Sequence, residues 1–157
     1  MLNDLIIFSA RYLYLLVIII ATIYFFFLPR NRQKDLIILM VIALPCIYLA
    51  SRAASYFYYD PRPFVTGHFL PLIPHASDNG FPSDHALLTS AIAAVIFFYN
   101  KKVSSILWLL AVIVGASRVL AGIHNWIDVI GAIILSAAIA SLAEYWLLHS
   151  KIISYKK

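Results

Sequence analysis

The sequence predicts an all-α polytopic membrane protein with about five transmembrane helices in a compact bundle. Hydrophobic residues make up 63% of the 157 residues and charged residues only 12%, against roughly 25% charged residues in ordinary globular domains. Several apolar runs approach the roughly 20 residues that a helix needs to cross a bilayer core. Because no stretch is left over for a soluble part, we expect one integral-membrane domain over residues 1–157.

Five apolar stretches predict the helices in chain order. The first lacks a basic region before it and a small-residue cleavage pattern after it, so we expect a retained helix and not a signal peptide. The third is the shortest, and the lone Cys46 lies in the second, which excludes an intramolecular disulfide. The predicted spans are residues 5–28, 36–56, 84–100, 103–120 and 126–148.

The positions of Lys and Arg predict the orientation, because short cytoplasmic loops carry an excess of positive charge. Eight basic residues follow the first span, separate the third from the fourth, or end the chain: Arg30, Arg32, Lys34, Lys101, Lys102, Lys151, Lys156 and Lys157. We expect the loop 59–83 and the turn at Gly122 to open on the opposite, outer side. The net charge of +5 then indicates topology and attraction to anionic headgroups. No basic stripe with interleaved aromatic residues indicates nucleic-acid binding.

The first polar motif is Arg62-Pro63, preceded by Arg52 near the end of the second span. A lone Arg-Pro in a loop is usually a solvated turn, and an arginine near a helix end can extend to the membrane interface. By itself, this motif is weak evidence for a site.

The second motif runs from Gly80 to His85, where the outer loop enters the third span. Ser83 or Asp84 could simply cap the helix. A helix N-terminus also attracts anions, because its N–H groups lack partners and the helix dipole favours negative charge. A cap needs no histidine, so His85 in this first turn favours phosphate chemistry.

The third motif sets Arg118, His124 and Asp128 inside apolar sequence, where charged groups are costly and indicate function. His124 and Asp128 are four residues apart, so we expect them on one helix face, with the carboxylate orienting the imidazole. Arg118 would lie on another face of an unbroken helix. We therefore expect Gly122 to interrupt the helix and let the guanidinium approach His124.

A metal site is the alternative use of these side chains. His85, His124 and Asp128 could supply three ligands, but the neighbouring arginines would oppose a bound cation. The sequence therefore predicts a site without a metal or another cofactor.

Together the three motifs, including Ser117 beside Arg118, resemble the three-part signature of the type 2 phosphatidic acid phosphatases, the PAP2 superfamily. The resemblance implies a PAP2-like helical bundle. It implies that His124 attacks phosphorus to form a phosphohistidine, that Asp128 orients it, and that His85 protonates the departing oxygen and then activates water. The phosphate-binding positions that we carry over are Arg62, Arg118, Ser83, Asp84 and Ser117.

Two positions depart from the family pattern. Ser55 stands where the family usually has a lysine, and Arg52, about one helical turn earlier, could supply the missing charge; Arg11 would be the next choice. Asp84 stands where many members have glycine, and members that resemble undecaprenyl diphosphate phosphatases often carry aspartate there.

The resemblance favours removal of the terminal phosphate of undecaprenyl diphosphate on the extracytoplasmic face of the bacterial cytoplasmic membrane, with the C-terminus cytoplasmic. Phosphatidylglycerophosphate, phosphatidate and lipid A 1-phosphate are alternative substrates, and a small anion- or proton-coupled transporter is the non-enzyme alternative. The expected partners are a lipid phosphate and the bilayer, while the oligomeric state stays open. We expect His68 and His75 to be solvated or locally hydrogen-bonded.

Overall fold

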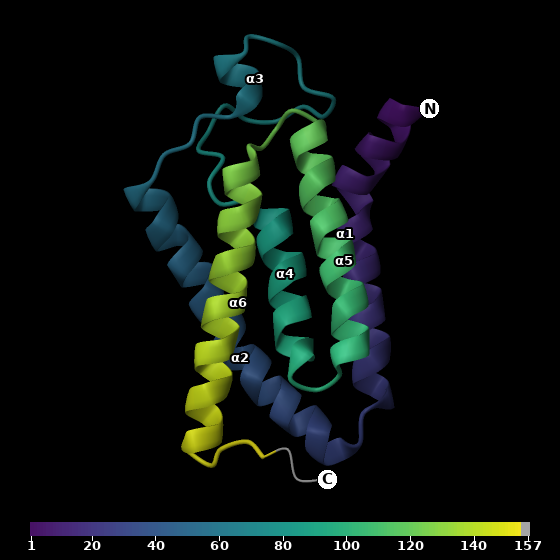
Figure 1. Cartoon of the computed structure of the whole chain (residues 1–157), viewed down its shortest axis with the longest axis vertical. Coiled ribbons are helices and arrows are strands. Elements are labelled where there is room, and N and C mark those ends of the chain that lie inside the picture. Colours follow the sequence, from purple (N-terminus) through teal and green to yellow (C-terminus); the bar gives the residue numbers. More distant parts are fainter. Residues whose placement is uncertain (155–157) are drawn as a thin grey trace.

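The computed structural model describes residues 1–154, and Lys156 and Lys157, expected on the cytoplasmic side, lie outside the described residues. Within that range the chain contains helices and no strands, which confirms the predicted fold class (Figure 1). The helices are α1 (Leu2–Phe27), α2 (Arg30–Phe57), α3 (Pro63–Thr66), α4 (Asp84–Phe97), α5 (Lys101–Leu120) and α6 (Trp126–His149).

Helix α4 differs from the other long helices, because it does not reach across a bilayer by itself. Helices α1, α2, α5 and α6 are long and apolar enough to do so. With 14 residues at about 1.5 Å each, α4 is only about 21 Å long, against roughly 30 Å of hydrocarbon. It begins lower than the upper ends of α5 and α6 (Figure 1). The outer loop must therefore descend into the bundle to meet it.

Helix α2 begins earlier than the sequence predicts. Residues 30–35, expected in a connecting loop, form its first turns directly after Pro29. The side-chain amide of Gln33 donates to the carbonyl of Phe25 at 3.1 Å, which closes the turn against the end of α1. Long basic side chains are compatible with a helix here, because their charged ends can reach water at the interface.

The two ends of the bundle differ in composition. The turns α1–α2 and α4–α5, with their basic residues, lie at the end of the bundle where α6 ends (Figure 1). The loop 58–83 and the turn between α5 and α6 lie together at the other end, so the predicted grouping of polar loops is present.

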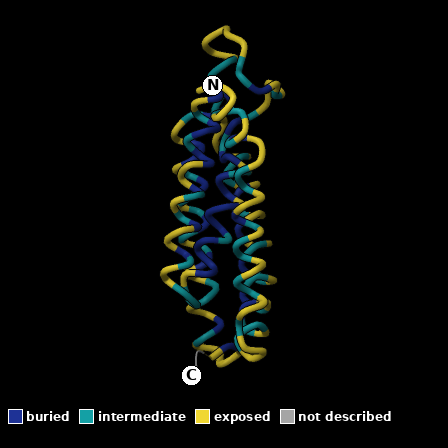
Figure 2. Tube along the Cα trace, turned by 90° about the vertical axis from the view of Figure 1, so that its right-hand side faces the viewer, coloured by how far each residue is buried: buried dark blue, intermediate teal, exposed yellow. Residues whose placement is uncertain are grey.

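Small side chains let α4 pack in the middle of the bundle, where close approach of backbones drives helix association in lipid. Nine of its residues are buried, among them Ala86, Ala93 and Ala94. The hydroxyls of Ser90 and Ser136 are 2.9 Å apart across α4 and α6. Figure 2 shows buried residues along the middle of the bundle and mostly exposed or half-buried ones outside. Helix α4 is therefore a fixed support for the loop that precedes it.

Candidate active site

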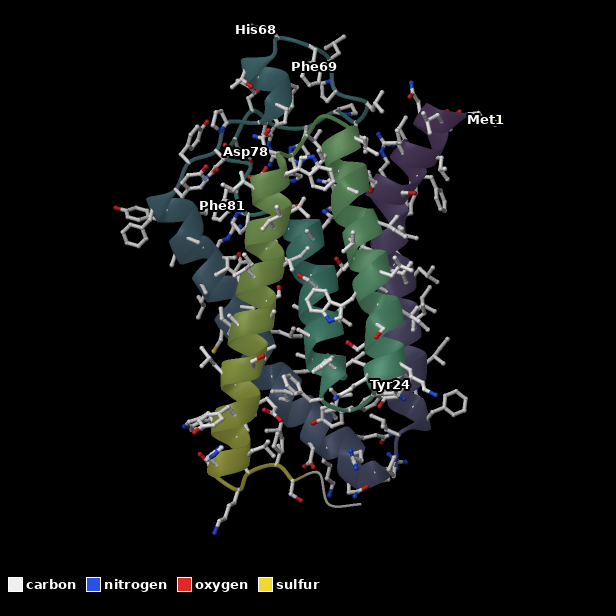
Figure 3. The ribbon with its side chains drawn as sticks, viewed as in Figure 1. Met1, Tyr24, His68, Phe69, Asp78 and Phe81 are labelled. Carbon is white, nitrogen blue, oxygen red and sulfur yellow. The ribbon has the colours of Figure 1, made fainter. Side chains whose placement is uncertain are left out.

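A polar cavity of about 160 Å³ lies beneath the outer loop and brings the predicted motifs together. Asp78 and Phe81, from its lining, lie near the upper ends of α5 and α6, at the end of the bundle that carries His68 and Phe69 (Figure 3). Its lining residues are Arg52, Ser55, Arg62, His75, Asp78, Asn79, Phe81, Pro82, Asp84, His85, Arg118 and His124.

The helix is interrupted between α5 and α6, as expected, and this interruption determines the geometry of the third motif. Gly122 has a φ of +78°, a left-handed conformation that glycine adopts without the steric cost of a Cβ. Helix α6 begins only at Trp126, so the prediction that His124 and Asp128 share a helix face is wrong. The contact itself is present: His124 Nδ1 lies 3.1 Å from Asp128 Oδ2, which also accepts from the N–H of Asn125 at 2.8 Å. A cap at the start of α6, and not helical spacing, places the carboxylate.

His124 is held in the form that a nucleophile needs. It is 3% exposed, and because Nδ1 faces the carboxylate, Nε2 points to the other side, 3.4 Å from Arg62 Nη1. Burial lowers the pKa of His124; the hydrogen bond that His124 donates to Asp128 opposes this, while the charges of Arg62 and Arg118 add to it. The imidazole is therefore neutral near pH 7, with a proton on Nδ1 and a lone pair on Nε2.

Arg62 is a buried arginine with fixed geometry, and not a solvated turn. Its Nε donates to Asp78 Oδ1 at 2.7 Å and its Nη1 to the carbonyl of Ile123 at 2.7 Å. Partial burial opposes ionisation of Asp78, but the hydrogen bond and charge of Arg62 outweigh it and lower the pKa of that carboxyl. The guanidinium is thus positioned beside His124.

Arg118 approaches the cavity from the last turn of α5. Its Nη1 donates to the carbonyl of Ala10 in α1 at 3.2 Å, and its Nη2 lies 3.4 Å from His75 Nε2. Its Nε is buried without a hydrogen-bond partner among the described residues. An unsatisfied buried donor is uncommon and costly in a native protein, so it calls for an explanation such as a bound ligand.

The second motif does not cap α4 through its serine. Ser83 stands at the N-cap position, but its hydroxyl is buried and has no hydrogen-bond partner in the described part of the chain. Its N–H donates to the carbonyl of Asp128 at 3.2 Å, which ties the start of α4 to α6. His85, half-buried, meets the ring of Tyr14 edge-on at 5.0 Å. Both Ser83 and His85 are thus fixed by neighbouring helices.

The rim of the cavity is formed by an exposed ion pair. Arg52 Nη2 lies 3.1 Å from Asp84 Oδ1, and these side chains are 44% and 72% exposed. Ser55, at the family's lysine position, accepts hydrogen bonds from the side chain of Asn79 through its hydroxyl and its carbonyl. Arg52 therefore supplies a positive charge at the rim of the cavity, and the uncharged Ser55 cannot.

Two predicted phosphate ligands, Ser83 and Ser117, are absent from the cavity lining. Ser83 directly follows the lining residue Pro82, and its buried hydroxyl has no partner in the described part of the chain. The hydroxyl of Ser117 instead donates to the carbonyl of Val114 at 2.7 Å, within its own helix, so we do not assign Ser117 a phosphate contact.

Two further loop residues belong to the site, although the sequence indicated no role for them there. His75, expected to be solvated or locally hydrogen-bonded, lies 3.4 Å from the carbonyl of Ala76 but also beside Arg118, with its ring 6.2 Å from that of His124. Burial and then the charge of Arg62 lower its pKa. Asn79 accepts from the N–H groups of Asp60 and Phe81 at 2.9 and 3.0 Å, and so organises the loop. The turn-forming residues Asp78, Asn79 and Gly80 were a sequence signal for such a loop. No sequence signal placed His75 in the site.

Gly80 lets the loop approach the Asp128 carboxylate. A Cβ at this position would lie 2.8 Å from Asp128 Oδ2 and 3.2 Å from the carbonyl of Asp60. Any larger residue at position 80 would therefore displace the group that orients His124. The Asp128 carboxylate also acts on Asp60: burial, together with this carboxylate, raises the pKa of Asp60, and the hydrogen bond that Asn125 donates to Asp60 opposes this.

The chemistry of the lining favours an anion. Three arginines and three histidines line the cavity, and no group of three His, Cys, Asp or Glu side chains among residues 1–154 is arranged to hold a metal ion. The lack of a metal requirement nevertheless stays a prediction.

A multi-pass helical membrane protein with a buried Arg/His/Asp site for an anionic group is the class that this fold and cavity define. The chain belongs to the PAP2 superfamily, which matches residues 36–151. Helix α1 precedes that match, yet it contacts Arg118 and His85 through Ala10 and Tyr14.

Relatives with known names are similar over part or most of the chain. Undecaprenyl-diphosphatase BcrC of Bacillus subtilis (strain 168) is 39% identical over 85 residues, which are 54% of this chain and 44% of that protein. The bacitracin transport permease protein BcrC of Bacillus licheniformis is 32% identical over 151 residues, 93% of this chain and 71% of that protein. The matched region is thus less than half of the Bacillus subtilis protein.

Two crystal structures share the fold. LpxE of Aquifex aeolicus has a TM-score of 0.68 at 22% identity, covering 92% of this chain and 86% of that one. A transmembrane PAP2 type phosphatidylglycerolphosphate phosphatase of Bacillus subtilis has a TM-score of 0.70 at 25% identity, covering 99% and 80%.

Proposed function

We propose that this protein is a lipid phosphatase that removes the terminal phosphate of undecaprenyl diphosphate and leaves undecaprenyl phosphate. The observation that carries the proposal is the buried His124, with Nδ1 on Asp128 and Nε2 beside Arg62, in a cavity rich in cations. The name of the Bacillus subtilis relative supports this substrate.

The first half of the reaction transfers the phosphoryl group to His124. Nε2 attacks the terminal phosphorus, a P–N bond forms, and the bond from phosphorus to the bridging oxygen breaks. His85, which takes up a proton when the negatively charged diphosphate binds beside it, donates that proton to the oxygen as the lipid phosphate leaves. Asp128 keeps the proton on Nδ1 and stabilises the positive charge on the phosphorylated ring.

The second half returns the enzyme to its starting state. His85, now neutral, takes a proton from a water molecule that attacks the phosphohistidine. The P–N bond breaks, inorganic phosphate leaves, and the electron pair returns to Nε2.

Buried donors are available for the phosphate oxygens. The guanidinium of Arg62 and the unpartnered Nε of Arg118 supply charge and hydrogen bonds. The buried hydroxyl of Ser83, between the lining residues Pro82 and Asp84, would add a third donor. Groups fixed in advance around the phosphorus stabilise the charge that develops in the transition state without reorganising. No step requires a metal ion.

An adjoining apolar groove supports a membrane lipid as the substrate. This groove, of about 350 Å³, shares Arg52 and Asp84 with the polar cavity and continues between α2 and α4 past Ile47, Leu87 and Ala91. A lipid whose phosphate occupies the cavity can thus pass its chain under the rim ion pair into the bilayer. With the basic end of the bundle in the cytoplasm, the cavity would face the extracytoplasmic side of the bacterial cytoplasmic membrane.

The test is phosphate release by purified protein with EDTA present, from undecaprenyl diphosphate, phosphatidylglycerophosphate and phosphatidate. We expect the diphosphate to be hydrolysed fastest, and His124→Ala to reduce release to background. A preference for phosphatidylglycerophosphate would assign the substrate named for the Bacillus subtilis structure. No release above the His124→Ala background, with or without EDTA, would favour a transporter, and loss of release only with EDTA would indicate a metal.

A further inference from the structure

A second cavity, of about 470 Å³, lies at the opposite end of the bundle, where α1 turns into α2. Tyr24, in the neighbouring turn of α1, marks this end, far from Asp78 (Figure 3). The cavity is lined by apolar residues from the end of α1 and by two basic side chains from the start of α2, Arg30 and Lys34. Its lining therefore combines basic and apolar side chains.

The two basic side chains are not neutralised. Arg30 and Lys34 are one helical turn apart on α2, so their side chains share a face. Both are exposed, and neither has an ionic partner among residues 1–154. Asp35 is next in sequence, but its carboxylate accepts from the N–H of Ser154 and is not part of the lining. The cavity therefore offers two positive charges to an anion at the membrane surface.

An apolar groove of about 310 Å³ continues from this cavity along α1, α2 and α4. The two share Phe25, Phe26 and Ile37, so they are contiguous. Further along, the groove is lined by residues such as Ala21, Met40 and Val95. A charged cavity at the interface that leads into an apolar groove has the two-part shape of a phospholipid.

We propose that the α1–α2 corner binds an anionic phospholipid, with the headgroup phosphate between Arg30 and Lys34 and one acyl chain in the apolar groove. Basic pockets of this kind, at the charged end of a helix bundle, select anionic headgroups over zwitterionic ones. The site lies at the other end of the molecule from His124 and does not depend on the proposed phosphatase activity.

The experiment measures binding of phosphatidylglycerol and phosphatidylcholine, with identical acyl chains, to the full chain in detergent by native mass spectrometry. Neither probe is a phosphomonoester or a diphosphate, so hydrolysis does not interfere. A basic residue near a charged surface contributes roughly fivefold in affinity. We expect the double variant R30Q/K34Q to lose roughly 10- to 30-fold in phosphatidylglycerol affinity and to bind both lipids alike.

The matched control is K101Q/K102Q, which removes two positive charges from the start of α5 at the same end; it should keep the preference for phosphatidylglycerol. Thr22→Trp, which fills the groove, should weaken both lipids. Elution volume and helical content check the fold of each variant. Equal binding of the two lipids to the unchanged protein, or equal losses in both double variants, would overturn the proposal. So would a Thr22→Trp variant that binds phosphatidylglycerol normally but has a raised KM for undecaprenyl diphosphate, since the groove would then hold the substrate's chain.

Discussion

The interior and the rim of the polar cavity use arginine in different ways. Arg62 and Arg118 are each 5% exposed, and each donates to a main-chain carbonyl, of Ile123 and Ala10. Arg52 is 44% exposed; it pairs with the carboxylate of Asp84 and lies over the ring of Tyr48. Carbonyls in packed segments fix the inner guanidiniums, whereas an exposed ion pair can rearrange at little cost. The inner arginines are therefore suited to stabilise the charge of a transition state, and the rim is suited to let substrate enter.

The largest effect is expected inside the cavity, from Asp128→Asn. The amide can keep the hydrogen bond from Asn125 but cannot stabilise a charged His124 ring. We expect kcat to fall by roughly 10³- to 10⁴-fold, as for the orienting carboxylate of other histidine sites. Steady-state phosphate release measures this loss, and a fall of less than about tenfold would show that the carboxylate only shapes the loop.

The second-largest effects on kcat are expected from Arg62→Lys and Arg118→Lys. Lysine keeps the charge but cannot reproduce the planar fork of N–H donors. We expect kcat to fall by about 10²- to 10³-fold for each, the loss typical of one donor to a developing negative charge. Arg52→Lys is the matched control at the rim. Equal losses at all three positions would remove the distinction between interior and rim.

Gly80→Ala tests whether the loop must approach Asp128. The new Cβ would lie 2.8 Å from Asp128 Oδ2 and should displace the carboxylate that orients His124. We expect kcat to fall by about 10²-fold, as small misplacements of catalytic groups commonly cause, with little change in KM. Unchanged kcat would mean that the loop can yield without moving the carboxylate.

The pH profile tests the state of His124. Because the pKa of His124 is lowered and only the neutral ring attacks, activity should persist as pH falls through 6.5, the ordinary histidine value. The acidic limb of kcat/KM should lie below that pH and move lower still in Asp128→Asn, which removes the group that favours the charged ring. An acidic limb above 6.5 would contradict the neutral resting state.

The smallest effects are expected at the rim, from Arg52→Gln and Asp84→Asn. An exposed ion pair contributes only about 0–1 kcal/mol, so we expect changes in kcat/KM of less than about fivefold, mainly in KM. Measuring both variants with the long-chain substrate and a short-chain analogue locates the effect. A loss in Arg52→Gln as large as in Arg62→Lys would show that Arg52 replaces the family lysine absent at Ser55.

The third motif could be predicted from the sequence only in part. The spacing of Arg118, His124 and Asp128 required a break at Gly122, and the break is present. The contact between His124 and Asp128 was expected from helical spacing but arises from the start of α6, because the helix begins only at Trp126. The motif positions and the break at Gly122 could be predicted, but the length of the non-helical segment that follows Gly122 could not.

The loop was the least predictable part. Non-periodic segments give no pattern that would place His75 beside Arg118, or make Asn79 the organiser of the loop. The start of α2 was not predicted because charged residues interrupt the apolar pattern but do not interrupt a helix at an interface.

The role of Ser117 could not be predicted from its place in the motif. Its hydroxyl donates within its own helix, a choice of partner that the sequence does not indicate.

The most direct test of the account is to look for phosphate on His124 during turnover. Purified protein is mixed with undecaprenyl diphosphate, quenched in base within one turnover and analysed by peptide mass spectrometry. We predict an acid-labile phosphate on His124 alone, absent from His124→Ala. Phosphate release at the normal rate by His124→Ala, or phosphate on another residue, would contradict the account.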